Sequence, residues 1–222
     1  KVVHDPKPLL PHPREKVIPP RTDLAKATGH LVVSDVYNGR NMAGVARGTV
    51  KEILIMEDLP KAFCRHGMHG YVNLHSTPTF RRVLGTVPVE EDGSASFELP
   101  AMRGVYFALL DKNGLAVKRM LSLTMVMPGE TASCAGCHEF RTQKIPRTAG
   151  LLATRRPPSA IKPYAGIPDI PNYIRDVQPV WDRNCVKCHN SDQPSGKVNL
   201  SGDFNEFYSQ SYYTLHARRQ VS

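Results

Sequence analysis

Residues 80–126 read FRRVLGTVPVEEDGSASFELPAMRGVYFALLDKNGLAVKRMLSLTMV, and this stretch decides the predicted fold. Apolar and β-branched runs alternate here with the polar clusters Glu91-Asp92-Gly93-Ser94 and Asp111-Lys112-Asn113-Gly114. Such clusters are typical of turns, and Asn-Gly between two apolar runs indicates a β-hairpin. Ala95 to Leu99 also alternates apolar and polar residues, which fits a half-buried strand. The stretch therefore predicts a series of short antiparallel strands.

The region before this stretch has the same character. Residues 30–37 are rich in β-branched side chains and run into the turn Asn38-Gly39, and residues 49–56 form a further strand-sized run. Turns that recur at this spacing are typical of a sandwich of about a hundred residues. We expect a mainly β fold, a β-sandwich over residues 29–128.

The flanking regions differ in composition. Residues 1–28 are rich in proline and charge and predict an extended arm, while residues 129–172 predict an irregular segment. From residue 173 to 222 the pattern indicates a small α-helical, cytochrome c-like segment, which the abrupt ending leaves compatible with truncation. Pro179 would either kink its helix or lie in the first turn of a shorter one.

Two Cys-x-x-Cys-His strings use four of the five cysteines: Cys134, Cys137, His138 and Cys185, Cys188, His189. In such a string the two thiols attach to one haem edge and the histidine ligates the iron. We therefore predict two c-type haems, with His138 and His189 as proximal ligands. A zinc site built from both cysteine pairs is the alternative, but the pairs are far apart for a compact zinc ribbon.

Candidates for the distal ligands are less defined. A cluster within residues 64–75 contains a thiol, a methionine, a phenol and the three histidines His66, His69 and His75. It could supply a distal ligand, line an open distal pocket or hold a second metal, or it could be a polar surface loop. His216 is a further candidate, on a C-terminal segment whose aromatic residues predict an apolar haem wall.

Charge and composition bound the class of protein. The formal net charge is +9, but two haems would bring about four propionate charges, which Arg and Lys commonly pair. We therefore expect no nucleic-acid partner. No apolar stretch approaches the about eighteen residues of a membrane span. Because haem is attached to such strings outside the cytoplasm, we expect an extracytoplasmic protein, of the periplasm, cell surface or an equivalent compartment. The first residues lack the apolar centre of a signal peptide.

A family resemblance rests on several of these residues. Residues 81–100, then Pro128-Gly129-Glu130 and the string from Cys134 to Glu139, resemble the hydrazine synthase alpha subunit middle domain and its multidomain relatives. Residues 177–189 resemble the C-terminal cytochrome c domain of the same family. The resemblance implies a β-sandwich with one haem, the catalytic one in the enzyme, followed by a cytochrome c-like domain whose second haem passes electrons.

One position departs from the family pattern. In the enzyme a tyrosine four residues after the first motif histidine ligates the catalytic iron, and that histidine turns to zinc. The corresponding residue here is Thr142, which cannot take that role. Hydrazine synthesis is therefore not supported by the resemblance, and His138 is expected to ligate its own haem.

The sequence leaves three functions open. The leading hypothesis is a dihaem electron-transfer protein whose partner is a redox protein or another cytochrome. The rival is a haem enzyme whose open first haem acts on a small nitrogen or oxygen species. A third is a cytochrome that assembles with copies of itself through the arm of residues 1–28, so that the haems form a relay.

Overall fold

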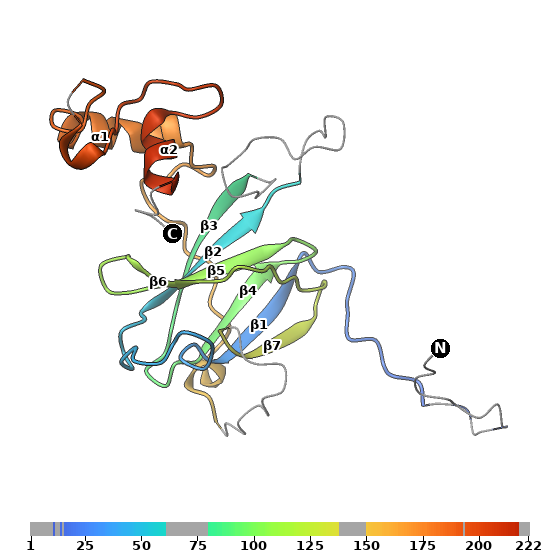
Figure 1. Cartoon of the computed structure of the whole chain (residues 1–222). Helices are drawn as coiled ribbons and strands as arrows, with labels where there is room; N and C mark the ends of the chain where they lie inside the picture. Colours follow the sequence, from blue (N-terminus) through green and yellow to red (C-terminus); the bar gives the residue numbers. More distant parts are fainter. Residues whose placement is uncertain are drawn as a thin grey trace, which may run out of the picture.

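The computed structural model describes residues 11, 14, 16–60, 80–137, 150–192 and 194–217. Seven strands form two sheets, and short helices follow them in the chain (Figure 1). The three-stranded sheet has the order β4-β1-β7 and the four-stranded sheet the order β3-β2-β5-β6. The strands are β1 Thr28–Asp35, β2 Glu52–Asp58, β3 Arg81–Pro88, β4 Ala95–Pro100, β5 Val105–Leu110, β6 Ala116–Arg119 and β7 Thr131–Gly136. The predicted mainly β fold is confirmed.

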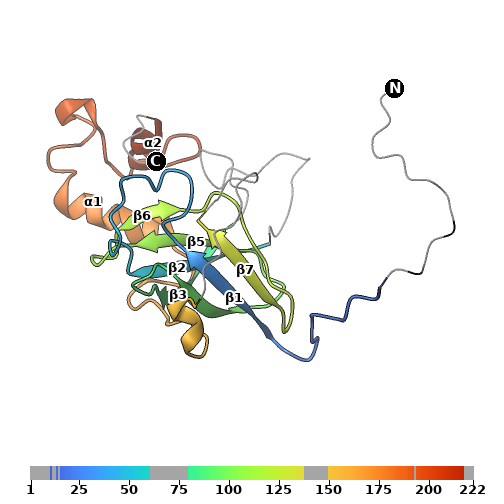
Figure 2. The same ribbon diagram turned by 90° about the horizontal axis from the view of Figure 1, so that it is seen from below.

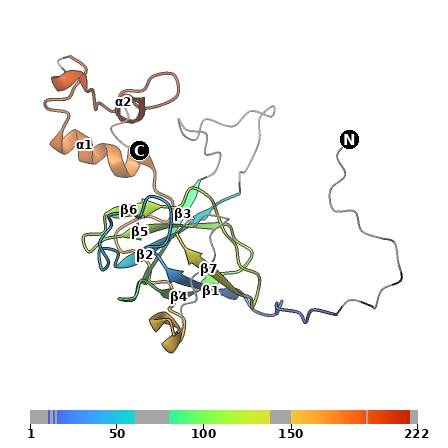
Figure 3. The ribbon, with the colours of Figure 1, turned by 60° about the horizontal axis from the view of Figure 1, so that its bottom comes forward.

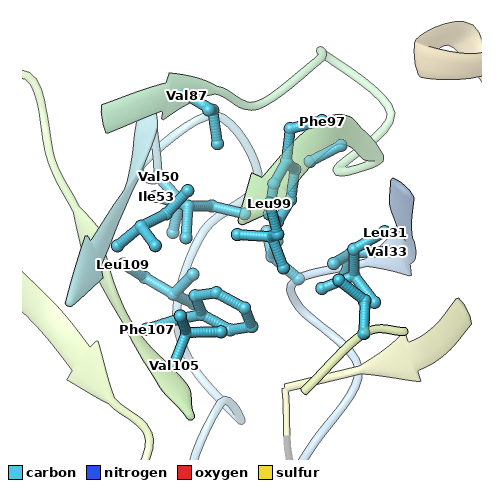
Figure 4. Packing of buried hydrophobic residues seen from close by; sticks show 14 of the residues in the cluster. Leu31, Val33, Val50, Ile53, Val87, Phe97, Leu99, Val105, Phe107 and Leu109 are labelled. Carbon is cyan, nitrogen blue, oxygen red and sulfur yellow. The ribbon is translucent and has the colours of Figure 1, made fainter. Parts of the chain in front are cut away.

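The hydrophobic core lies between the two sheets (Figure 4). Burial alternates along β1 and β2, as expected for strands with one face toward a core. Phe97 of β4 and Phe107 of β5 meet edge to face, with ring centroids 5.8 Å apart, and so join the two sheets. Burial of these side chains is the main stabilising contribution to the domain, at about 25 cal/mol per Å² of apolar area.

The segment after residue 150 closes one side of the domain. Ser159 pairs with β4, since its N–H donates to Ser96 O (2.9 Å), and Lys162 pairs with β3 through Thr86. At Gly85 the φ angle is +141°, and a Cβ there would collide with the carbonyl oxygen of Lys162. Glycine at this position therefore permits the close approach of the segment to β3.

The segment of residues 129–172, expected to be irregular, contains the strand β7. It pairs in parallel with β1, in a register that places Cys134 beside Val33. The first cysteine pair therefore lies on the edge of the three-stranded sheet. At the other end of the domain, Asp23 N–H donates to Pro128 O (2.8 Å), and residues 16–22 lead away from the sheets (Figure 2).

The described helices are short: those of residues 178–184 and 210–217 lie on one side of the sheets, whereas that of residues 152–155 lies away from these two helices, near β4 (Figure 3). They are η1 Leu152–Arg155, η2 Tyr173–Val177, α1 Gln178–Asn184, η3 Ser195–Lys197 and α2 Gln210–Ala217. Pro179 lies in the first turn of α1, where its missing N–H costs no helical hydrogen bond. None of the helices in the described part of the chain is long and apolar enough to cross a membrane.

Candidate haem-attachment sites

The first cysteine pair is held by a close contact between β7 and the turn after β1. The N–H of Cys137 donates to the carbonyl oxygen of Asn38 (2.8 Å). A Cβ on Gly136 would collide with that same oxygen, and a Cβ on Gly39 would collide with the carbonyl oxygen of Cys137. The glycine between the two cysteines is therefore a steric requirement of the fold at this point.

Both cysteines of this pair line a cavity of about 410 Å³ between the two sheets. This inter-sheet cavity is within the range of about 300–1,000 Å³ typical of cofactor pockets. Its walls are mostly apolar and come from both sheets: Val33, Val36, Arg40, Ile53, Phe107, Leu109, Met120, Leu123, Thr124, Cys134, Gly136 and Cys137. A flat apolar group attached to the two thiols would be enclosed by aliphatic side chains and one aromatic ring.

A second cavity, of about 420 Å³, adjoins the first and shares Arg40, Met120 and Cys137 with it. We call it the basic cavity, because Arg40, Lys118 and Arg119 all line it. Carboxylates bind well to such cationic side chains, and Arg can hold a carboxylate through two parallel hydrogen bonds. An apolar slot with two thiols beside a basic cavity matches the chemistry of a haem ring with its propionates.

The second cysteine pair follows α1 in a tight turn. Cys185 N–H donates to Trp181 O (2.7 Å), while the N–H groups of Cys188 and His189 both donate to Cys185 O (3.1 and 2.9 Å). This turn brings the main chain of Cys188 and of His189 back to that of Cys185. Trp181 in turn donates its indole N–H to Tyr173 Oη (2.9 Å), which fixes α1 against the preceding turn.

His189 is half-buried, and its ring is oriented by a backbone group. Nδ1 lies 3.2 Å from the carbonyl oxygen of Val198. A carbonyl only accepts, so Nδ1 carries the hydrogen and donates it, which leaves the lone pair on Nε2. Metal-ligating histidines are commonly oriented in this way. The main chain of this loop is also tied, since Leu200 N–H donates to His189 O (2.8 Å).

His216 lies on α2 and is packed within an aromatic group. Its ring lies against that of Tyr212, with centroids 4.1 Å apart, and its Nδ1 donates to Tyr212 O (3.0 Å). Tyr212 also contacts the rings of Tyr173 and Tyr208. With Nδ1 as the donor, Nε2 carries the lone pair of this ring. The role of His216 as a distal ligand stays a prediction.

A further cavity of about 510 Å³ lies between the sheets and the C-terminal segment. Phe204, Phe207, Tyr208 and Tyr212 line it, four of the aromatic residues expected to form a haem wall. Residues of the sheets also line this cavity, among them Met56, Arg81 and Tyr106. Cys185, Cys188 and His189 are not among its described lining residues, so the aromatic residues gather at the junction with the sheets.

Several predicted site residues lie outside the described part of the chain: His66, His69, His75 and His138, together with Cys64 and Thr142. Within the described ranges, no three His, Cys, Asp or Glu side chains gather as a metal-binding group. The four cysteines of the two strings are all described, and the structure places one pair at β7 and the other after α1. It thus does not bring them together as the zinc alternative requires.

Arg40 and Met120 were not singled out from the sequence, yet both line the two cavities beside the first cysteine pair. Lys118 and Arg119, which line the basic cavity, were missed as well. Only the adjacency of two basic residues at the end of a predicted hairpin could have pointed to them. Their position near Cys137 depends on how the two sheets pack on each other, which no local sequence pattern indicates.

These features define a mainly β domain whose cysteine pair faces an inter-sheet cavity, followed by a short helical segment with a second pair. The family model of the hydrazine synthase alpha subunit middle domain matches residues 48–139. This match confirms the resemblance to that family over these residues and does not extend to the cytochrome-like part.

A solved structure, Kuenenia stuttgartiensis hydrazine synthase, has the same fold, with a TM-score of 0.66 and 18% sequence identity. The match covers 86% of this chain and 34% of that chain, so this chain spans about a third of the length of its structural relative. No curated protein sequence matches the chain.

Proposed function

We propose that the chain is an extracytoplasmic c-type cytochrome that binds two haems covalently and passes electrons through them. The observation that carries this proposal is the position of Cys134 and Cys137 on the wall of an apolar cavity beside a basic one. The similarity to hydrazine synthase supports a haem-related function. When bound, each haem supplies a one-electron couple at its iron.

The residues of the first site have separate tasks. Cys134 and Cys137 would anchor the haem through thioether bonds, and His138 would ligate its iron. The apolar walls would exclude water from a bound ring and would influence its reduction potential by lowering the local dielectric constant. Arg40, Lys118 and Arg119 would pair with the propionates and neutralise their charge.

At the second site, Cys185 and Cys188 would anchor the haem and His189 would ligate its iron through Nε2. The hydrogen bond from Nδ1 to Val198 O orients the imidazole and raises its basicity as a ligand. His66, His69, His75 or His216 would be candidates for the remaining axial positions. The partner would be a redox protein, and the residues before β1 could contact a second copy of the chain.

A second candidate is a haem enzyme with a labile position at the first iron. The observation in its favour is the space beside the first cysteine pair, where the basic cavity adjoins the inter-sheet cavity. A small nitrogen or oxygen species could reach the haem there. The family match to a hydrazine synthase domain supports the same reading.

Carbon monoxide separates the two candidates. The experiment records the absorption spectrum of the dithionite-reduced protein before and after addition of carbon monoxide. An electron-transfer protein with six-coordinate irons leaves both haem spectra unchanged. A shift in the Soret band of one haem would show an open or labile iron and favour the enzyme.

A further inference from the structure

The inter-sheet cavity contains one side chain suited to a sixth iron ligand. Apart from the two thiols, the described residues that line it and carry side-chain nitrogen, oxygen or sulfur are Arg40, Thr124 and Met120. Arg has no lone pair to offer and a neutral hydroxyl is a poor iron ligand, whereas the thioether of methionine is a common axial ligand in cytochromes c. Met120 is therefore the candidate that the cavity itself presents.

The main chain of Met120 is fixed while its side chain has room to move. Its N–H donates to Phe107 O (2.8 Å), which ties the residue directly after β6 to the neighbouring strand β5. The side chain is half-buried against the core. Methionine has three rotatable side-chain bonds and adapts to irregular space, so a fixed backbone does not prevent the sulfur from changing position.

Three cavities meet at this residue. Met120 lines the inter-sheet cavity, the basic cavity and a cavity of about 370 Å³ that also contains Tyr106 and Asp58. A side chain bordered by free space on several sides can reorient without displacing packed neighbours, which in a close-packed interior would cost free energy. The thioether can therefore turn toward a group that occupies the inter-sheet cavity.

The thioether and the thiols come from different sheets. Cys134 lies on β7, at the edge of the three-stranded sheet, and Met120 follows β6, at the edge of the four-stranded sheet. A haem held by Cys134 and Cys137 between the sheets would thus have its attachment on one sheet and Met120 on the other. This arrangement suits a ligand that approaches the iron independently of the motif histidine.

We propose that the Met120 thioether is the sixth ligand of the first haem iron. The proposal rests on the proposed function, because it requires a haem on Cys134 and Cys137. Methionine–histidine ligation raises the reduction potential relative to ligation by two histidines. The first haem would then have the higher potential if the second haem has two histidine ligands.

The test uses the full chain with Cys185→Ser and Cys188→Ser, so that only the first haem is attached. Three proteins are compared: this parent, Met120→Leu in the parent, and Met125→Leu as the matched control from the same loop, since Met125 is 50% exposed and does not line the cavity. The readouts are covalent haem content, the far-red charge-transfer band of thioether-ligated ferric haem, and the midpoint potential.

The expected result is a charge-transfer band in the parent and in the Met125→Leu control, and none in Met120→Leu. The Met120→Leu protein should also have a lower potential and bind carbon monoxide when reduced. If haem is attached but the parent lacks the band, or Met120→Leu keeps it, Met120 is not the ligand and the proposed function still stands. If no haem is attached to Cys134 and Cys137, the proposed function fails and the ligand assignment fails with it.

Discussion

The amide of Cys137 donates to the carbonyl oxygen of Asn38 where β7 closely approaches the turn after β1. This contact sets the position of the second thiol relative to the inter-sheet cavity. It depends on glycine at Gly39 and Gly136, since a Cβ at either position would collide with backbone. Packing of two glycines thus connects the turn sequence Asn38-Gly39 with the first Cys-x-x-Cys-His string.

Substitution of Gly136 by alanine should therefore separate β7 from this turn. We expect Gly136→Ala to lower the free energy of unfolding by about 1–3 kcal/mol, as is typical of overpacking, and to reduce haem attachment at the first pair. Urea unfolding and haem staining measure the two effects. Gly104→Ala is the matched control, because a Cβ there would make only ordinary contacts, at 3.6 and 3.7 Å, with Leu123. Equal stability of the two variants would contradict the prediction.

Gln178 connects the elements around the second cysteine pair. It is 4% exposed, donates to Asp182 Oδ1 and Leu200 O, and accepts from the hydroxyl of Ser211. Substitution by leucine would leave the buried Leu200 carbonyl and the Ser211 hydroxyl without this partner, at about 1–3 kcal/mol for each group.

We expect Gln178→Leu to lower the unfolding temperature of the C-terminal segment and to broaden the spectrum of the second haem, because Leu200 also binds the main chain of His189. Thermal unfolding followed by circular dichroism and by Soret absorbance measures both effects. Asn184→Ala is the control, since it removes one hydrogen bond at the surface. A Gln178→Leu variant as stable as this control would contradict the prediction that Gln178 stabilises the loop that carries His189.

His30 makes stability depend on pH. Burial lowers the pKa of His30 below its usual 6.5, against the opposing effect of Glu98, and its Nε2 pairs with Ser96 Oγ (2.8 Å). The unfolded chain therefore binds this proton more readily than the folded chain. The contribution to stability is present above pH 6.5 and is lost as the pH falls toward the folded pKa.

Replacement of His30 by glutamine keeps a hydrogen-bonding side chain and removes the titration. We expect the free energy of unfolding of His30→Gln to fall less than that of the parent between about pH 7 and pH 5, the range in which histidine titrates. Urea unfolding at both pH values gives the comparison. Identical slopes would mean that His30 does not contribute to acid sensitivity.

The elements that could be predicted from the sequence are those whose sequence patterns are local. The strands up to residue 110 could be predicted because alternation and turn residues are local, and β2 and β5 lie in predicted runs. The strand β7 was not predicted. Its residues Thr-Ala-Ser-Cys-Ala-Gly are small, and its pairing with β1 depends on a partner far away in the chain.

The candidate sites show the same division. The cysteine strings could be recognised because both thiols must reach one haem edge, which fixes a short spacing. The walls of the inter-sheet cavity could not, because Arg40 and Met120 approach the first pair only through the stacking of two sheets. The donor role of His189 Nδ1 is also a property of the folded loop, since Val198 has no sequence signal for it.

The most direct test of the central claim is the covalent haem content of the chain, produced in a host with the c-type haem attachment system. Intact-mass spectrometry of the unsubstituted chain should show the added mass of two haems. The pair Cys134→Ser and Cys137→Ser, and separately the pair Cys185→Ser and Cys188→Ser, should each leave one. A chain that carries no haem, or whose haem content does not change when Cys134 and Cys137 are replaced, would contradict the account.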